Sequence, residues 1–181
     1  CALPICIDGD LELQTDGNAP ATPWGPGPNN VVKIRGSAQS PFRNLYAAGQ
    51  LGVHLPNSGA YNGFGQTLTN HWKAEKTERL FASFDFRSAS VEKGGDGTWR
   101  YYLGHGPGSS AAIELFFNGR EFFRRSADKR EVVQPLRVGE WYQVQLALNL
   151  KEKTYTGSIS SVSNRTEFGG KIASGWDGSV D

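Results

Sequence analysis

Aromatic side chains are the residues of this sequence whose types and positions best suit ligand binding. Three tryptophans lie in or beside polar or glycine-rich segments, and a tyrosine and a histidine follow one of them closely. Sugar rings stack their C–H faces on Trp and Tyr rings, and neighbouring polar groups bind the hydroxyls. The sequence therefore predicts a carbohydrate-binding set made of Trp72, Trp99, Tyr101, His105 and Trp176. As the alternative, Tyr101 packs in a core and His105 ends a strand.

The spacing of the histidines and serines does not favour a zinc site or a nucleophilic serine. The three histidines, His54, His71 and His105, include no pair at metal-ligand spacing, so a zinc site is not expected. Ser109 and Ser110 lack the Gly-x-Ser-x-Gly context of a nucleophilic serine.

The charge balance gives no sign of a nucleic-acid partner. Lys and Arg number 19 and Asp and Glu number 18, which leaves a formal net charge of +1. The longest basic cluster is expected to be a solvated strand end and loop rather than a phosphate site; it consists of Arg124, Arg125, Lys129 and Arg130. No apolar run approaches the ~18 residues of a membrane span, so none is predicted.

Strands must position these residues, because the hydrophobic period is two over the clearest part of the chain. From Leu80 to Arg87 apolar and polar residues alternate, with Phe81 as the exception, which predicts a half-buried strand. Trp99–His105 and Val31–Arg35 are further predicted strands. The segment Thr69–Glu78 is the best candidate for a helical turn, although it could equally be a loop.

Two hairpins complete the predicted meander from Arg79 to Ser161. Asn118-Gly119 separates strands over 112–117 and 120–125, and this dipeptide predicts a type I′ turn with positive φ at both residues. From Glu140 to Leu150 the two faces separate almost without error, and a return strand follows Lys153. Several antiparallel strands in succession predict an all-β fold, a two-sheet antiparallel sandwich or jelly roll.

The segment Gly139-Glu140-Trp141-Tyr142-Gln143-Val144, with the return strand Thr154–Ile159, resembles concanavalin A-like jelly rolls and LamG-like domains in particular. The resemblance covers roughly Arg79 to Ser161. Sandwiches of that kind often hold calcium with loop carboxylates and carbonyls, chemistry that suits a hard cation. The resemblance therefore implies structural calcium, with Asp8, Asp10, Asp96 and Asp181 as candidate ligands. A plain acidic turn is the alternative for Asp8-Gly9-Asp10.

Enzymes of this fold define what the chain would need for catalysis. Its glycosidases carry a Glu-x-Asp-x-(x)-Glu run that holds two carboxylates at catalytic spacing, and no such run exists here. Its lyases use Tyr, His, Gln and Arg on one sheet. The residues that could supply such a set are Arg100, Tyr101, Tyr102, His105, Gln143 and Gln145.

A non-catalytic carbohydrate-binding or adhesion module of a secreted, periplasmic or cell-surface protein is the favoured interpretation. The alternatives are an accessory domain of a larger multidomain protein and a jelly-roll polysaccharide lyase or glycoside hydrolase. We expect one sandwich domain over residues 1–181, truncated at its C-terminus or excised from a longer protein. Methionine is absent even at position 1, and the final residues 178–181 resemble the start of a last strand.

Overall fold

Antiparallel strands carry almost all the regular structure of this protein. The computed structural model describes residues 8–27, 31–36, 39–42, 49–56, 63–66, 72–73, 79–88, 98–126 and 129–180. The only helical element in this part is one 3₁₀ turn, Gly108–Ser110, which confirms the predicted all-β class. No helix in the described part is long and apolar enough to cross a membrane. The chain forms two compact units, Cys1–Asn70 and His71–Asp181.

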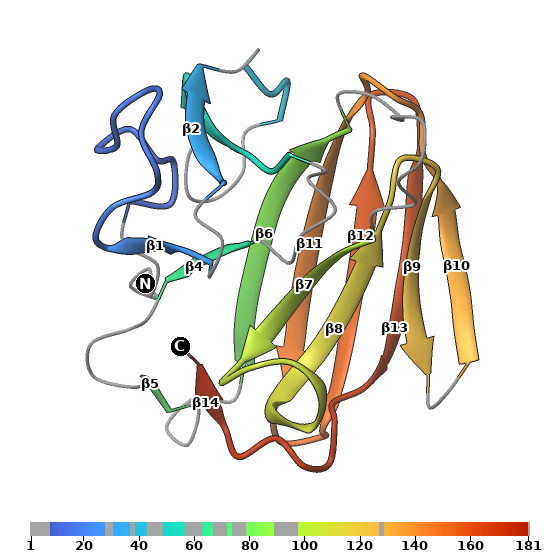
Figure 1. Ribbon diagram of the computed structural model, residues 1–181. Helices are drawn as coiled ribbons and strands as arrows, with labels where there is room; N and C mark the ends of the chain where they lie inside the picture. Colours follow the sequence, from blue (N-terminus) through green and yellow to red (C-terminus); the bar gives the residue numbers. More distant parts are fainter. Residues whose placement is uncertain are drawn as a thin grey trace. The chain divides into compact units, whose positions relative to one another are not determined.

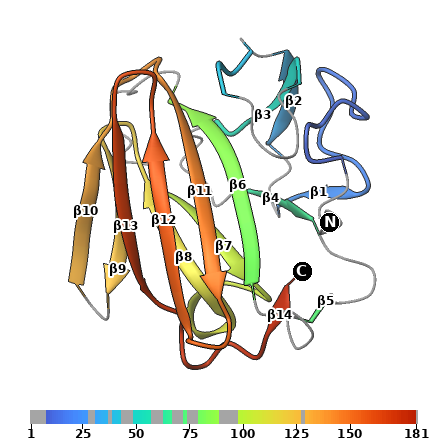
Figure 2. The same ribbon diagram turned by 180° about the vertical axis from the view of Figure 1, so that it is seen from behind.

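The second unit contains two four-stranded antiparallel sheets, seen as two layers in Figures 1 and 2. The first, here called the β11 sheet, has the order β13 (Arg165–Lys171), β12 (Thr154–Ser160), β11 (Trp141–Asn149) and β6 (Arg79–Arg87). The second, here called the β8 sheet, has the order β10 (Lys129–Pro135), β9 (Glu121–Ser126), β8 (Ala111–Phe117) and β7 (Trp99–Gly104). Between β6 and its neighbour β11 the chain runs through the whole β8 sheet.

The core lies between these two sheets. One face of β11 is fully buried and consists of Tyr142, Val144, Leu146 and Leu148, as the alternation predicted. Aromatic rings join the two layers. The ring centroids of Phe84 and Tyr101 are 4.4 Å apart, and those of Phe86 and Phe117 are 4.5 Å apart. The two sheets therefore form the predicted antiparallel sandwich.

A glycine in β12 makes this packing possible. A Cβ atom on Gly157 would lie 2.6 Å from Cζ of Phe168 and 2.9 Å from Cδ2 of Leu146. Both distances are far inside van der Waals contact, so the missing side chain lets these two residues fill the core next to β12.

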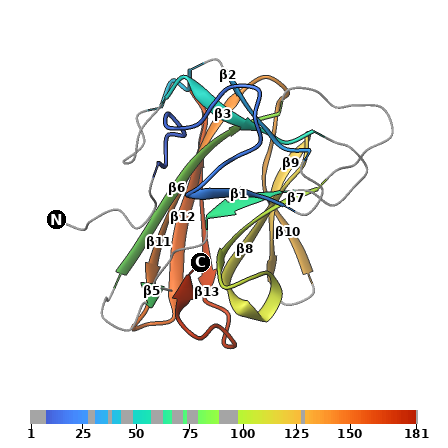
Figure 3. The same ribbon diagram turned by 60° about the vertical axis from the view of Figure 1, so that its left-hand side comes forward.

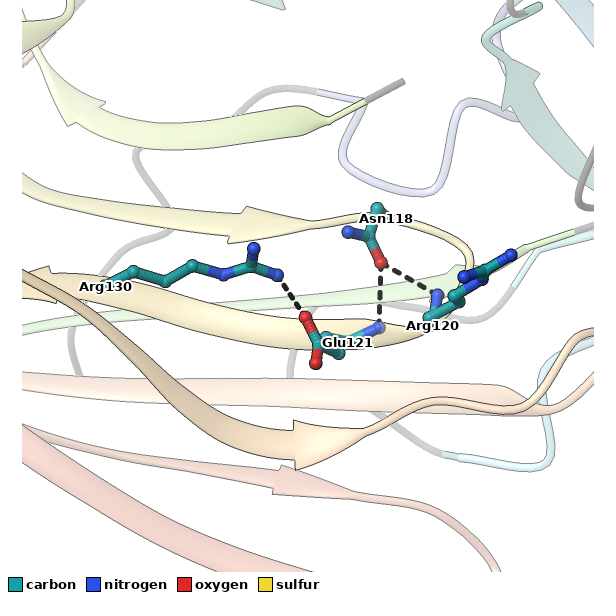
Figure 4. A network of polar contacts seen from close by, with 4 residues as sticks. All are labelled: Asn118, Arg120, Glu121 and Arg130. Atoms are coloured by element: carbon teal, nitrogen blue, oxygen red, sulfur yellow. Dashed lines mark hydrogen bonds and ion pairs between the residues drawn. The ribbon is translucent and has the colours of Figure 1, made fainter. Parts of the chain in front are cut away.

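The β8–β9 hairpin is confirmed, but the predicted type I′ turn is wrong. Neither Asn118 nor Gly119 has a positive φ. The backbone N–H of Asn118 donates to the carbonyl of Glu121 (3.1 Å), which places Asn118 at the first position of the turn. Its Oδ1 accepts the backbone N–H groups of Arg120 and Glu121, both at 2.8 Å (Figure 4). This side-chain acceptor stabilises the turn in place of left-handed backbone.

The sequence did not predict two strands of the four-stranded sheets, β10 and β13, nor the short strands over 24–26, 51–54 and 64–66. Strand β10 begins with three charged residues, and β13 contains Gly169 and Gly170, so neither shows clear alternation. Of the segment 69–78, only Trp72 and Lys73 are described; they form the short strand β5 (Trp72–Lys73), which pairs with β14 (Ser179–Val180). The rest of the predicted helical turn lies outside the described residues.

The first unit contains two small sheets, visible in Figure 3. Strand β1 (Trp24–Pro26) pairs with β4 (Phe64–Gln66), and β2 (Lys33–Gly36) pairs with β3 (Leu51–His54). Strand β2 overlaps the strand predicted over 31–35. Trp24 ties β1 to the turn that begins at Asp8, since its indole N–H donates to the carbonyl of Asp8 (2.8 Å).

Candidate functional site

Two of the predicted sugar-binding residues belong to the core. The ring of Tyr101 stacks on Phe84 between the two sheets. Trp176 is buried, and its indole N–H donates to the carbonyl of Ser179 (2.7 Å). Neither ring faces solvent in a way that would let a sugar stack on it.

Of the other three predicted residues, only Trp99 and His105 have described side chains. Trp99 is half-buried on the same face of β7 as Tyr101 and pairs with Phe117 of β8. His105 is exposed beyond the end of β7, where its backbone N–H donates to the carbonyl of Ser110 (3.1 Å). Trp72 lies in β5, and its side chain is outside the described residues. Among the described side chains of this set, Tyr101 and Trp176 pack inside and His105 is exposed, and the role of Trp72 stays a prediction.

The predicted calcium ligands are only partly within the described chain. Asp8 accepts the backbone N–H of Leu13 (3.0 Å) and the side-chain amide of Gln14 (2.7 Å), so its carboxylate organises a turn. Asp10 accepts the backbone N–H of Glu12 at 3.4 Å. Asp96 and Asp181 lie outside the described residues. Among the residues that are described, no three His, Cys, Asp or Glu side chains gather at metal-binding distance, and calcium stays a prediction.

The residues considered for a lyase lie on different faces. Gln143 and Gln145 point away from the core on the β11 sheet. Arg100 and Tyr102 alternate with the inward Tyr101 and point away from the core on the β8 sheet. These two outer faces are on opposite sides of the sandwich, so the proposed lyase set does not converge.

The outer face of the β11 sheet gathers polar side chains from strands far apart in sequence. Cross-strand partners on β11 and β6 are Trp141 with Arg87, Gln143 with Asp85, and Gln145 with Ser83. Ser158 of β12 lies beside Gln145. We call these seven residues the polar face; Figure 2 shows their sheet in front of the other.

Hydrogen bonds connect the centre of the polar face. Gln143 Nε2 donates to Asp85 Oδ1 (3.2 Å), and Gln145 Nε2 donates to Gln143 Oε1 (3.0 Å). The side chains of Gln143 and Ser158 point away from the core, yet Gln143 is only 8% exposed and Ser158 only 4%. The amide of Gln143 is therefore fixed in orientation by partners on two sides.

Two polar atoms of this face are buried without a hydrogen-bond partner in the described part of the chain. They are the hydroxyl oxygen of Ser83 and the indole nitrogen of Trp141. The guanidinium of Arg87 lies 5.3 Å from the centroid of the Trp141 ring. A buried polar group without a hydrogen-bond partner lowers stability by about 1–3 kcal/mol. In a native fold such a group usually has a water or a ligand as its partner.

The clearly shifted pKa values belong to residues on the core side of the sheets. Burial raises the pKa of the Tyr142 hydroxyl, which accepts the backbone N–H of Arg137 (2.8 Å). Burial likewise raises the pKa of the Tyr155 hydroxyl beside Arg124. Both tyrosines are thus held neutral as parts of the packed interior.

Sequence reasoning missed the polar face although it identified both contributing strands. The outward positions of β6 and β11 were correctly separated from the apolar ones. The pairing of β6 with β11 was not visible, because 53 residues lie between the end of β6 at Arg87 and the start of β11 at Trp141.

Comparison with protein-family models, with curated proteins and with solved structures found no match to this chain.

Proposed function

We propose that this protein is a non-catalytic carbohydrate-binding module of an extracellular protein, and that the polar face is its binding surface. The observation that carries the proposal is the pair of buried atoms without partners, Ser83 Oγ and Trp141 Nε1, at the two ends of a hydrogen-bonded row. A sugar hydroxyl both donates and accepts, so it can satisfy the indole N–H and the serine hydroxyl alike once the side chains that cover these two atoms move aside.

The length of the polar face suits an oligosaccharide. Trp141 and Gln145 are four residues apart on one strand, which corresponds to about 13 Å. Between them lie the amide of Gln143 and the carboxylate of Asp85, groups that together offer donors and acceptors. Several consecutive sugar rings can therefore contact this row at once.

The placement of acids supports binding without hydrolysis. On the outer face of the β11 sheet Asp85 lies on β6 and Glu167 on β13, with β12 and β11 between them. Three strand spacings put these backbones about 14 Å apart. Glycosidases hold their two carboxyl groups about 5–9.5 Å apart.

The chain path from β6 through the β8 sheet and back to β11 supports our proposal of a concanavalin A-like jelly roll.

The test is a glycan array with the full chain, followed by calorimetric titration of each glycan that binds. Gln143→Ala and Trp141→Ala should each weaken binding about tenfold, because each removes an oriented hydrogen-bond donor or a ring surface worth about 1 kcal/mol or more.

Thr156→Ala is the matched control, since Thr156 is exposed on the same face beside Ala147 and outside the polar face. It should leave the affinity unchanged. Absence of binding to every glycan by the folded protein, or equal affinity of wild type and Gln143→Ala, would refute the proposal.

A further inference from the structure

The outer face of the β8 sheet carries an unusual arrangement of arginines on aromatic rings. Phe116 of β8 and Phe123 of β9 are cross-strand partners, stacked with centroids 5.3 Å apart and planes at 13°. They are only 4% and 5% exposed, although they point away from the core. We call this surface the arginine face; it consists of Arg100, Phe116, Phe123, Arg125 and Arg130.

Guanidinium groups cover the two rings. Cζ of Arg125 lies 4.8 Å from the centroid of Phe116, and Cζ of Arg130 lies 4.1 Å from that of Phe123. Cation–π contact attracts each guanidinium to its ring and restricts the side chain that carries it. The planar donor groups are therefore held in place over the sheet before any ligand arrives.

The charges on this face are not balanced pairwise. Arg125 and Arg130 are direct cross-strand partners, a position where like charges destabilise a sheet. Arg130 forms an ion pair with Glu121 (Figure 4), and Arg100 forms one with Glu114 at 3.2 Å. The guanidinium of Arg125 has no ion pair or hydrogen bond with any described residue. An anion between Arg125 and Arg130 would relieve their repulsion.

We propose that the arginine face binds an anionic polysaccharide, whose carboxylate or sulfate groups are held by Arg125 and Arg130. The flat guanidinium fork binds such groups through two parallel hydrogen bonds. The Cα atoms of cross-strand partners are about 4.5–5.5 Å apart, so the two arginines leave the backbone at positions about one sugar ring apart. Half-exposed Tyr102 and Val132, beside the arginines on the same face, supply surface for the apolar sides of the rings.

The same surface fits nucleic acid poorly. Duplex DNA carries one charge per about 1.7 Å, whereas this face presents three arginines together with the carboxylates of Glu114 and Glu121. Those carboxylates would repel closely spaced phosphates. A polymer with about one charge per sugar matches the arrangement better. This inference does not rest on the polar face, which lies on the other sheet.

The experiment titrates the full chain with three polysaccharides, polygalacturonate, dextran sulfate and neutral dextran, at two salt concentrations. We expect binding to at least one of the two anionic polymers, weakening with salt, and none to neutral dextran. Whichever anionic polymer binds identifies the group that is recognised.

Variants locate the binding. Arg125→Gln should weaken it about tenfold, because one charge-assisted contact is lost while the side-chain stem over Phe116 remains. Arg125→Lys should lose part of the affinity, since the charge stays but the planar fork is gone. Arg165→Gln, which removes the same charge from an exposed position on β13, should have no effect.

Three results would overturn the inference. The first is an equal loss of affinity in Arg125→Gln and Arg165→Gln, which would indicate an effect of net charge alone. The second is an affinity for duplex DNA or polyglutamate equal to that for the anionic polysaccharide. The third is no binding to either anionic polysaccharide. Gln143→Ala separates the two proposals, because it should leave binding of the anionic polymer intact while weakening binding at the polar face.

Discussion

Phe122 on β9 lies fully inside the sandwich, with its ring 5.5 Å from Phe168 and 6.4 Å from Phe86. Phe81 on β6 points to the opposite side of its sheet and is 48% exposed. The same deletion, Phe to Ala, should therefore have very different effects at the two positions. Phe122→Ala should lower the free energy of unfolding by about 3–5 kcal/mol, through lost burial and a cavity.

Phe81→Ala is the matched control and should change the free energy of unfolding by no more than about 0.5 kcal/mol. Urea unfolding followed by tryptophan fluorescence measures both. Similar losses for the two variants would mean that Phe81 is covered in solution and that its face of β6 is not free.

The side chains that sequence could assign were those whose role depends on one strand alone. Phe81 was recognised as out of phase from the alternation of its own strand. Trp176 could not be assigned in this way, because its burial depends on a backbone carbonyl three residues later, at Ser179, and on the pairing of β14 with β5. The local sequence around a tryptophan in a glycine-rich segment is the same whether its indole packs in the core or binds a ligand.

At the scale of the element, the β8–β9 turn depends on one side-chain oxygen. Asn118→Ala removes the acceptor for the N–H groups of both Arg120 and Glu121. The free energy of unfolding should fall by about 1 kcal/mol, the usual net value of such a hydrogen bond. Asn118→Asp keeps the oxygen and should retain most of the stability. Equal losses in both variants, measured by thermal unfolding, would show that Oδ1 does not hold the turn.

The error in turn type and the missing strand β13 share a physical cause. Asn-Gly predicts a hairpin correctly because both residues tolerate tight turns, but the register that the flanking strands adopt decides which residue occupies which position. In β13, a Cβ on Gly169 would lie 2.8 Å from the carbonyl oxygen of Tyr155, and one on Gly170 would lie 2.8 Å from Nη1 of Arg124. Tertiary neighbours therefore require glycine at these two positions, and the local periodicity of the sequence carries no information about them.

At the scale of the molecule, Arg124 joins the two sheets at one side of the sandwich. Its guanidinium, on β9, donates to the carbonyl of Gly169 on β13 and forms an ion pair with Glu131 on β10 (2.7 Å). The basic cluster 124–130 is therefore divided, since Arg124 faces inward while Arg125 and Arg130 face outward. The sequence predicted solvated charge there, and only the pairing of strands reveals two different surroundings.

The two sheets and the core between them lie within residues 71–181, so this segment should fold by itself. A fragment of residues 71–181 should show a β-sheet circular dichroism spectrum and one cooperative unfolding transition. A fragment of residues 71–135 is the control: it lacks β11, β12 and β13, leaves the apolar face of the β8 sheet uncovered, and should not fold. If residues 71–181 also failed to fold while the full chain unfolded in one transition, residues 1–181 would be the single domain expected from the sequence, and Cys1–Asn70 would be required for its stability.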